Sequence, residues 1–486
     1  MPQDLFVGLD AGTQGARAIA CDAEGRVAAE ASVPFAHSPT SPRPGWHEQD
    51  PEDWWAAALA CLQAVVSKAA DAGHSREALR RLAVSSTSGT VLLIDDAGRP
   101  LRPAIMYSDN RAAAEAERIN QIAGLLCEKM GYRFSASFAL PKILWLAEHE
   151  PKALEAGRIC HAADFLVGRL TGRYDVSDTS NVLKTGYDLL DGRWPAFVGD
   201  LGLPLGRLPS VLRPGETIAR MTTEVAERTG LSQMALVVAG ATDGTAGFLA
   251  SGACQVGQWC STLGTTLVLR GVSREIVRDP LGRIYSHAHP DGLWLPGAAS
   301  NVGGECLESR FKGKSLARLD TQVARHLPNK LLLYPLARRG ERFPFADPEA
   351  EGFLRGRVRG QGQLYAAHLE AVAFVERWCF DIMAQLGLPI ASPIFASGGA
   401  TASDVWLQLR ADVLNRPLRV AANAHSAKGA ALLAASSALG SLGEAVTRMV
   451  RFEKSVEPRP DLRSYLDDKY ALFREACSQV YPTSRG

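Results

Sequence analysis

The same succession of short strands, glycine-containing turns and a long helix occurs twice along this chain. In the first occurrence, three apolar or alternating segments with glycine-containing turns predict an antiparallel meander. These segments are residues 5–10, 16–22 and 26–35. A helical period follows over residues 50–72, where Asp50 is suited to cap the helix and Pro51 to be its first residue. Residues 81–100 then predict two further strands.

The pattern returns in the second half in the same order of elements but with different residues. It consists of a buried strand, a glycine loop and a small-residue helix, then a meander, a long helix and one more strand. The corresponding segments are residues 234–254, 257–271, 292–300, 362–387 and 392–397. Because one hydrophobic core seldom organises 486 residues, we expect two related α/β domains. We place them at residues 1–238 and 239–486.

Composition narrows the class of protein. The formal net charge is +1, with no long basic or acidic run, so nucleic acid and anionic membranes are not expected partners. Hydrophobic residues make up 46% and charged residues 22%, and no run approaches the ~20 apolar residues that span a bilayer. Nine scattered cysteines without a C-x-x-C pair indicate a reducing compartment. We therefore expect a cytoplasmic enzyme, and a homodimer is compatible with the sequence.

The turn from Asp10 to Arg17, "DAGTQGAR", has the residues that a phosphate site needs. Gly12 lets the backbone approach an anion, Thr13 adds a hydroxyl donor, and successive N–H groups can form an anion-binding nest. Asp10 is a hard oxygen ligand suited to Mg²⁺. Taken alone, the turn is better explained as a hairpin whose glycines serve geometry and whose aspartate caps it. Arg17 either supports the turn or contacts phosphate, and its place inside a strand favours support.

Two further turns resemble the first. "STLGTT" contains Gly264 and Thr265 between two apolar strands, at the equivalent place in the second meander. Two such turns, one in each half, favour phosphate binding over a pair of plain hairpins. Farther on, a strand ends in Ser397-Gly398-Gly399-Ala400 before a helix. Without side chains, Gly398 and Gly399 allow a flat ring to pack on the backbone.

These motifs together resemble the FGGY carbohydrate kinases, within the sugar kinase/Hsp70/actin-like superfamily. The resemblance covers nearly the whole chain and rests on "LDAGTQGAR", "GWHEQDPEDWW", "PAIMYSDNRA", "GATDGTAG", "STLGTT", "GERFP", "SGGATASDVWLQLRADVLNRP" and "AKGAALLAA". It implies two ribonuclease-H-like domains with an active-site cleft between them, in which ATP phosphorylates a sugar hydroxyl. It also implies these roles: Asp243 as general base, Asp10 with Mg²⁺, Gly12, Thr13, Gly264 and Thr265 at the ATP phosphates, and Gly398 and Gly399 at adenosine. A bare N-cap of the helix starting at Gly244 or Thr245 is the alternative role of Asp243.

The sugar pocket departs from that of xylulose kinases. Thr87-Ser88 stands where those kinases usually carry Met-His before the glycine, and Gly244 stands where they often carry Asn. The pocket is therefore smaller and more hydroxylic, which argues against D-xylulose. The segments "TQGAR" and "TSGT" resemble a smaller, xylulose kinase-like group that prefers D-ribulose, and this resemblance implies D-ribulose as substrate, with Gln14, Ser88, Asp109 and Asp243 as candidate sugar contacts. D-xylulose or another FGGY substrate is the alternative, and a salt bridge with Arg111 is the other interpretation of Asp109. A nucleotide-dependent sugar sensor or an actin-like ATPase is the alternative of a different class.

Overall fold

The computed structural model describes residues 4–482, which form two units that are each described by themselves. The first unit contains the chain up to Cys254, His287–Trp294 and Asn423–Arg451. The second contains Gln255–Ser286, Leu295–Ala422 and the chain from Phe452 onward. The boundary expected between residues 238 and 239 falls inside strand β12 (Leu236–Thr242). This strand pairs with a strand of the first sheet and therefore belongs to the first unit.

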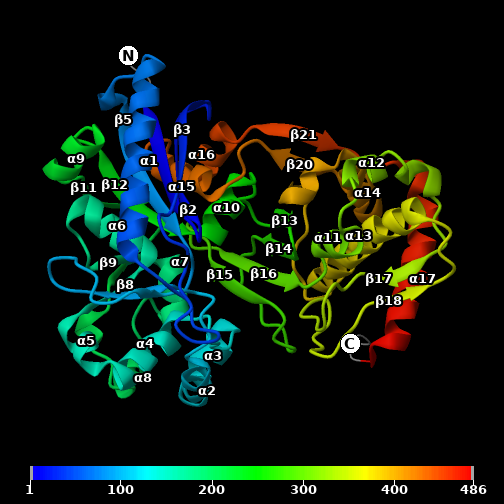
Figure 1. Cartoon of the computed structure of the whole chain (residues 1–486), viewed down its shortest axis with the longest axis horizontal. Helices are drawn as coiled ribbons and strands as arrows, with labels where there is room; N and C mark the ends of the chain where they lie inside the picture. Colours follow the sequence, from blue (N-terminus) through cyan, green and yellow to red (C-terminus); the bar gives the residue numbers. More distant parts are fainter. Residues whose placement is uncertain (1–3, 483–486) are drawn as a thin grey trace. The chain divides into compact units, whose positions relative to one another are not determined.

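The main sheet of the first unit has the strand order β11-β12-β5-β1-β2-β3 (Figure 1). Its strands are β1 (Leu5–Ala11), β2 (Gly15–Asp22), β3 (Val27–Pro34), β5 (Leu79–Ser86), β11 (Thr217–Arg220) and β12 (Leu236–Thr242). Strands β1, β2 and β3 pair antiparallel, which confirms the predicted meander. Strands β5 and β12 then run parallel to β1 and to each other. Smaller sheets are formed by β4 (Glu48–Gln49), β6 (Val91–Ile94), β7 (Ala104–Ile105) and β8 (Arg158–His161), and by β9 (Val176–Asp178) with β10 (Ser210–Leu212).

Helices of the first unit pack on its main sheet, on its smaller sheets and on one another. They are α1 (Pro51–Asp71), α2 (Ala113–Ile122), α3 (Gly124–Met130), α4 (Ala139–His149), α5 (Pro151–Ala156), α6 (Ala162–Thr171), α7 (Thr179–Val182), α8 (Ala196–Asp200), α9 (Thr223–Thr229), α10 (Asp243–Ala250), α15 (Ser426–Ser436) and α16 (Leu442–Met449). Helix α1 begins as predicted, with Pro51 in its first turn and the Asp50 carboxylate accepting the Glu52 N–H at 2.9 Å. Helix α15 lies against β1, where a Cβ on Gly8 would come within 1.8 Å of the Ala427 carbonyl oxygen (Figure 1).

The main sheet of the second unit has the order β15-β16-β14-β13-β19-β20-β21. Its strands are β13 (Trp259–Leu263), β14 (Leu267–Gly271), β15 (Tyr285–Ala288), β16 (Trp294–Ser300), β19 (Ile394–Ser397), β20 (Leu418–Ala421) and β21 (Phe452–Val456). Antiparallel β16, β14 and β13 are followed by parallel β19 and β20. This is the arrangement of β3, β2, β1, β5 and β12 in the first unit. The two expected halves therefore share one topology.

The other elements of the second unit pack around helix α13 (Gln361–Gln385), which the sequence predicted over residues 362–387. They are the helices α11 (Glu305–Arg310), α12 (Leu316–Asp320), α14 (Asp404–Leu414) and α17 (Arg463–Val480) and the strand pair β17 (Leu332–Tyr334) and β18 (Phe353–Arg355). Trp259, Trp378 and Phe374 are among the largest fully buried side chains of its core. Within residues 4–482, no helix has both the length and the apolar character that crossing a bilayer requires.

Candidate active site

Three parallel strands of the first unit end at the same edge of its sheet. In the register of β1 and β5, Asp10 pairs with Ser85 and Ala11 with Ser86. In the register of β12 and β5, Thr242 also pairs with Ser86. Asp243 follows Thr242 directly, so the strand register places Asp10 and Asp243 at the carboxyl ends of β1 and β12, the two strands on either side of β5. Open α/β sheets bind their ligands at this edge.

Asp10 is a half-buried carboxylate with an unusual proton affinity. Burial and the nearby charge of Asp243 raise its pKa to about 7, although a hydrogen bond from Ser85 Oγ and the charge of Arg17 oppose the change. Arg17 lies on β2 with its Nε 3.8 Å from Oε1 of Glu30, a contact that fits support of the turn. Two neighbouring carboxylates create a negative site that a cation stabilises.

Asp243 is the first residue of α10, and Thr242 occupies the N-cap position. The structure therefore contradicts the interpretation of Asp243 as the bare N-cap of a helix that starts at Gly244 or Thr245. It also removes the predicted glycine loop, because the strand passes directly into the helix. The Asp243 Oδ1 accepts the Gly244 N–H at 2.6 Å, which orients its half-buried carboxylate.

A buried polar network holds the backbone in front of Asp243. The Thr242 N–H donates to Ser180 Oγ at 2.8 Å, and that hydroxyl donates to the Asp178 carboxylate at 2.5 Å. Burial raises the pKa of Asp178, while hydrogen bonds from Ser180 and Asn181 oppose the rise. Asp178 and Ser180 carry no motif signal, and only the packing of α7 against β12 reveals their role.

The first glycine turn is held by its backbone. The Gly12 N–H donates to the Gly15 carbonyl at 3.0 Å, and Gln49 Nε2 donates to the Thr13 carbonyl at 2.7 Å. These bonds leave the Thr13 hydroxyl 3.4 Å from the Tyr107 hydroxyl, and the Gln14 side chain is exposed. The turn is therefore held mainly through its backbone, with one long side-chain hydrogen bond between Thr13 and Tyr107.

Two lysines tie down the loop that carries Ser88. Lys142 Nζ donates to the Gly89 carbonyl at 3.0 Å and to the Phe138 carbonyl at 3.3 Å, and Lys184 Nζ donates to the Ser88 carbonyl at 3.3 Å. Burial lowers the pKa of Lys142 to about 7. Within the described part of the chain, the buried Ser86 and Ser88 hydroxyl oxygens have no hydrogen-bond partner. The sequence did not indicate either lysine.

Asp109 forms the ion pair with Arg111 that its alternative interpretation anticipated. Arg111 Nε and Nη2 donate to the two carboxylate oxygens at 3.0 and 2.8 Å, and the His47 N–H adds a bond of 2.6 Å. The Asp109 carboxylate is completely buried, and the Arg111 guanidinium carbon lies 3.8 Å from the Trp46 ring centroid. A contact between Asp109 and the sugar stays a prediction.

Also in the first unit, one carboxylate oxygen each of Glu115 and Glu148 and a ring nitrogen of His149 lie within 4.8 Å of one another, a spacing that could hold a metal ion. Arg118 already hydrogen-bonds to the Glu148 carboxylate, so a cation of the chain itself supplies positive charge there.

In the second unit, a cavity of about 440 Å³ brings together three of the predicted nucleotide residues, Gly264, Thr265 and Gly399. Gly398, directly before Gly399, has a φ of +87°, and a Cβ on Gly398 would meet the Leu263 carbonyl oxygen at 2.5 Å. Four more residues of the cavity wall follow Gly399 in the same motif: Ala400, Ala402, Ser403 and Trp406. The rest come from separate elements and were not predicted: Gly304, Leu307, Glu308, Leu316, Ala317, Asp320 and Tyr365. Trp406 is 4% exposed and belongs to the core of the second unit as well as to the cavity wall.

Three of the predicted glycines have no internal reason to lack a side chain. A Cβ on Gly264 or Gly399 would meet no atom within 4 Å, and one on Gly12 would come no closer than 3.8 Å to the Gly15 carbonyl oxygen. None of the three has a positive φ. Their open space is what the close approach of a ligand to the backbone requires.

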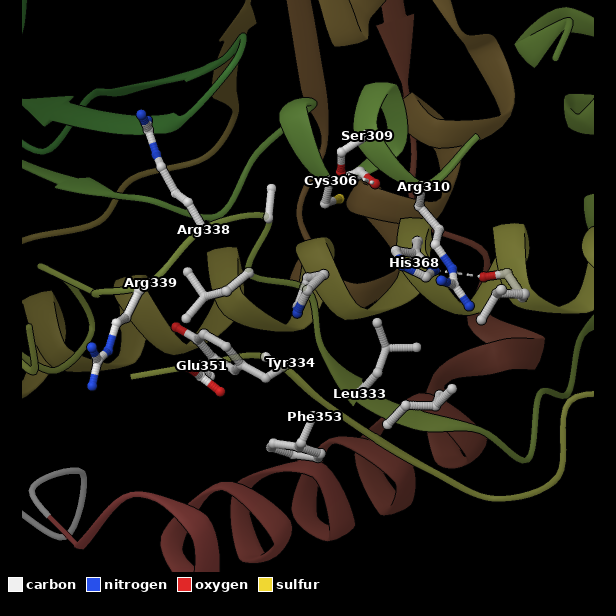
Figure 2. A pocket seen from close by; sticks show the side chains of 16 residues that line it. Cys306, Ser309, Arg310, Leu333, Tyr334, Arg338, Arg339, Glu351, Phe353 and His368 are labelled. Atoms are coloured by element: carbon white, nitrogen blue, oxygen red, sulfur yellow. Dashed lines mark hydrogen bonds between the residues drawn. The ribbon is translucent and has the colours of Figure 1, made fainter. Parts of the chain in front are cut away.

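A second cavity, of about 510 Å³, lies on the other side of α11 from these residues. Its wall includes Cys306, Ser309 and Arg310 of α11 and Leu333 and Tyr334 of β17 (Figure 2). Leu307 and Glu308 of the same helix line the first cavity. Helix α11 therefore forms a wall of both cavities.

Models of the N-terminal and C-terminal domains of the FGGY family of carbohydrate kinases match residues 5–250 and 262–438 of this chain. The chain belongs to this family. The xylulose kinase of Escherichia coli (strain K12) is 28% identical over 98% of this chain and 99% of that protein. The xylulose kinase of Streptomyces rubiginosus is 30% identical over 93% and 92%. The crystal structure of xylulose kinase from Rhodospirillum rubrum, at 29% identity, has a TM-score of 0.87 and covers 99% of this chain and 100% of that one.

Membership confirms the fold class and the enzyme class expected from the motifs. This FGGY kinase is an ATP-dependent sugar phosphotransferase, whose small-molecule partners are a sugar and ATP. The catalytic and binding residues assigned from the motifs stay predictions, and they are taken up below with the geometry that supports them.

Proposed function

We propose that this FGGY kinase phosphorylates a terminal hydroxyl of a ketopentose, with D-ribulose as substrate and D-ribulose 5-phosphate as product. The observation that carries the proposal is the pair of buried hydroxyls, Ser86 and Ser88, which have no partner among the described residues and lie in the same unit as Asp243. Buried hydroxyls without partners cost free energy, and the hydroxyls of a small sugar relieve that cost. Ser88 stands where xylulose kinases usually carry histidine, which supports a sugar other than D-xylulose.

D-xylulose is the second candidate substrate, and the comparisons favour it. Curated relatives named xylulose kinase match nearly the whole of this chain at 28–30% identity. The two sugars differ in the configuration of one carbon, so a few pocket residues decide between them. Residues 87 and 88 are the first ones to test.

In this proposal Asp243 accepts the proton of the reacting hydroxyl, O5 of the ketopentose. A carboxylate in this role typically contributes a factor of ~10²–10⁴ in rate. The Gly244 N–H orients the carboxylate, and the network from Asp178 through Ser180 to Thr242 fixes the backbone before it. Gln14 and Ser88 are the proposed sugar contacts. Protein groups mainly position the phosphoryl group and stabilise its charge.

In this proposal, each unit has one glycine turn that binds phosphate. In the second unit, Gly264 and Thr265, which line the 440 Å³ cavity, bind phosphate. Gly399, which also lines the cavity, and Gly398 directly before it bind adenosine. Gly12 and Thr13 bind phosphate at the edge of the first sheet. In support, Gly12, Gly264 and Gly399 have open space where a side chain would stand.

Mg²⁺ fits the carboxylates at the edge of the first sheet. The raised pKa of Asp10 reflects burial beside Asp243, an arrangement of hard oxygen ligands that a divalent cation stabilises. Asp10 is the residue proposed to hold the ion, directly or through water. When bound, Mg²⁺ neutralises charge on the transferring phosphoryl group.

The proposal is tested by measuring ADP release with D-ribulose, D-xylulose, other pentuloses, pentitols and glycerol, and kcat/KM for each active sugar. We expect the highest kcat/KM with D-ribulose, and a higher value with D-xylulose would decide for the second candidate. The Asp243→Ala variant should lose at least 100-fold in kcat while still binding ADP, since only the base is removed. No ADP above the sugar-free background with any of these compounds would refute the proposal. Thr87→Met combined with Ser88→His should move the preference toward D-xylulose.

A further inference from the structure

The motif "GERFP" contains a buried carboxylate that none of the roles above explains. The Glu341 side chain belongs to the second unit and is 3% exposed. Its Oε1 accepts the backbone N–H groups of Asn301 and Arg342 at 2.7 and 2.8 Å. Its Oε2 accepts the hydroxyls of Ser300 and Tyr334 at 2.9 and 2.8 Å. The Phe343 N–H adds a longer hydrogen bond to Oε1 at 3.5 Å, so five donors from three segments converge on one carboxylate.

The Asn301 side chain reinforces this network. Its Nδ2 donates to the Gly340 carbonyl at 2.8 Å, and its Oδ1 accepts Arg342 Nε at 2.7 Å. Tyr334 extends the network to the wall of the second cavity, where Figure 2 shows its ring. Glu341 and its neighbours therefore hold residues 300 and 301 at the end of β16.

The backbone that follows residue 301 supports the Gly264–Thr265 turn. The Leu267 N–H donates to the Val302 carbonyl at 2.8 Å, the Gly304 N–H to the Gly264 carbonyl at 2.7 Å, and the Glu305 N–H to the Thr265 carbonyl at 3.2 Å. A Cβ on Gly303 would lie 2.4 Å from the Thr265 carbonyl oxygen, so the two backbones are in close contact. Any shift of residues 300–305 must move the turn.

These bonds occupy the carbonyl side of the turn. In the described part of the chain, no hydrogen bond uses the backbone N–H of Thr265. A turn with engaged carbonyls and an available N–H presents a donor to an anion.

We propose that Glu341 is the positioning residue of the Gly264–Thr265 turn, which it holds in the geometry that binds a nucleotide phosphate. It acts through Ser300 and Asn301 and touches no substrate. The inference rests on the proposed role of Gly264 and Thr265 in phosphate binding.

Two substitutions of Glu341 distinguish the effect of losing its hydrogen-bond network from the effect of losing its negative charge. Glu341→Ala removes every acceptor and leaves the Asn301 and Arg342 N–H groups unpaired. In Glu341→Gln, the amide oxygen can still accept both N–H groups, and the amide nitrogen can donate to the Ser300 and Tyr334 hydroxyls, which then act as acceptors. The glutamine variant should therefore rescue most of what the alanine variant loses.

Glu370→Ala is the matched control in the same unit. Glu370 is 1% exposed and accepts the Tyr465 hydroxyl at 2.7 Å and the Lys469 ammonium, but it has no bond to the turn or to residues 300–305. Its loss removes a comparable buried carboxylate without touching the nucleotide site.

The measurement is the Kd of ADP by calorimetry on the full chain, together with KM for ATP and for the sugar that the panel shows to be most active. For Glu341→Ala we expect ADP affinity to fall by about tenfold or more, since small misplacements of binding groups have effects of this size or larger. The sugar KM should stay within about twofold of the wild-type value, because the sugar contacts lie in the other unit. Glu341→Gln and Glu370→Ala should bind ADP within about threefold of the wild type.

Gly264→Val separates failure of this inference from failure of the proposed function. A Cβ at this position meets no atom within 4 Å, so the valine side chain starts in open space and occupies the space proposed for phosphate. If Gly264→Val weakens ADP binding and Glu341→Ala does not, the inference is overturned and the phosphate turn stands. If neither variant weakens ADP binding, the proposed phosphate-binding role of the Gly264–Thr265 turn is refuted, and so is the inference that rests on it. Equal losses of ADP affinity in Glu341→Ala and Glu370→Ala would also overturn the inference, because any buried carboxylate would then have the same effect.

Should Glu341→Ala not fold, the double variant Ser300→Ala/Tyr334→Phe takes its place, since it removes both donors to Oε2. Its ADP affinity should fall by about threefold or more with the sugar KM unchanged, an intermediate effect because Oε1 keeps its bonds. Unchanged ADP affinity in that variant overturns the inference.

Discussion

Replacing Lys142 by methionine removes a buried amine that holds the loop of Ser88. The side chain is completely buried, and its Nζ reaches the Gly89 and Phe138 carbonyls at 3.0 and 3.3 Å. Burial and the charges of Lys184 and Arg111 lower its pKa from 10.5 to about 7, against the attraction of Asp109. A neutral amine still has two N–H donors for two carbonyls, so the native structure accommodates the uncharged form.

The lowered pKa makes stability depend on pH with a defined sign. Between pH 7 and 10.5 the unfolded chain binds a proton at Lys142 that the native protein does not, so the free energy of unfolding rises with pH. At about 1.4 kcal/mol per pH unit, the whole interval corresponds to about 5 kcal/mol. This stability is fully present above pH 10.5 and is lost as the pH falls toward 7. Lys142→Met lacks the titrating group. The difference in free energy of unfolding between the wild type and this variant should therefore increase in favour of the wild type by about 3 kcal/mol from pH 7.5 to 9.5.

The assay is urea unfolding of both proteins at several pH values in that window, without ligands. Lys68→Met is the matched control, because Lys68 is exposed and also donates to a backbone carbonyl, that of Glu30, at 2.7 Å. Its stability should run parallel to that of the wild type. A wild-type advantage over Lys142→Met that stays constant within about 0.5 kcal/mol across the window would refute the reasoning, since the linkage requires a slope.

Three further predictions concern other parts of the molecule. Ser180→Ala removes the hydroxyl that accepts the Thr242 N–H, directly before Asp243. We expect kcat to fall about tenfold with KM for ATP unchanged, because the Asp243 carboxylate is then less well positioned. A change in KM for ATP alone would contradict this. Gly429→Ala places a Cβ 1.8 Å from the Ala246 carbonyl oxygen, so unfolding should cost roughly 3 kcal/mol less; an unchanged melting temperature would contradict the close packing of α15 on α10. A Cβ on Gly399 meets no atom within 4 Å, so the melting temperature of Gly399→Val should stay constant, while ADP affinity falls about tenfold because the side chain occupies the cavity. Wild-type ADP affinity in this variant would exclude Gly399 from the nucleotide site.

Local sequence signals determined the elements from which this kinase is built. The period-2 segments at residues 5–34 became a meander, and Asp50 and Pro51 marked the start of α1, because strand alternation and helix capping depend on neighbouring residues. The motifs also identified the family, since their order and separation are properties of the chain itself. For the same reason Gly264, Thr265 and Gly399 could be assigned to one site before any contact between them was known.

Tertiary structure decided what these elements bring together. The pairing of β12 with β5 places Asp243 at the same end of the sheet as Asp10, although the two residues are far apart in the sequence. The same pairing makes β12 part of the first unit. Strand register is set by hydrogen bonds between remote segments and by the cores that they cover, which no local pattern encodes. Lys142 and Glu341 are recognisable only in three dimensions, because a lysine or a glutamate has no special meaning until burial and its partners give it one.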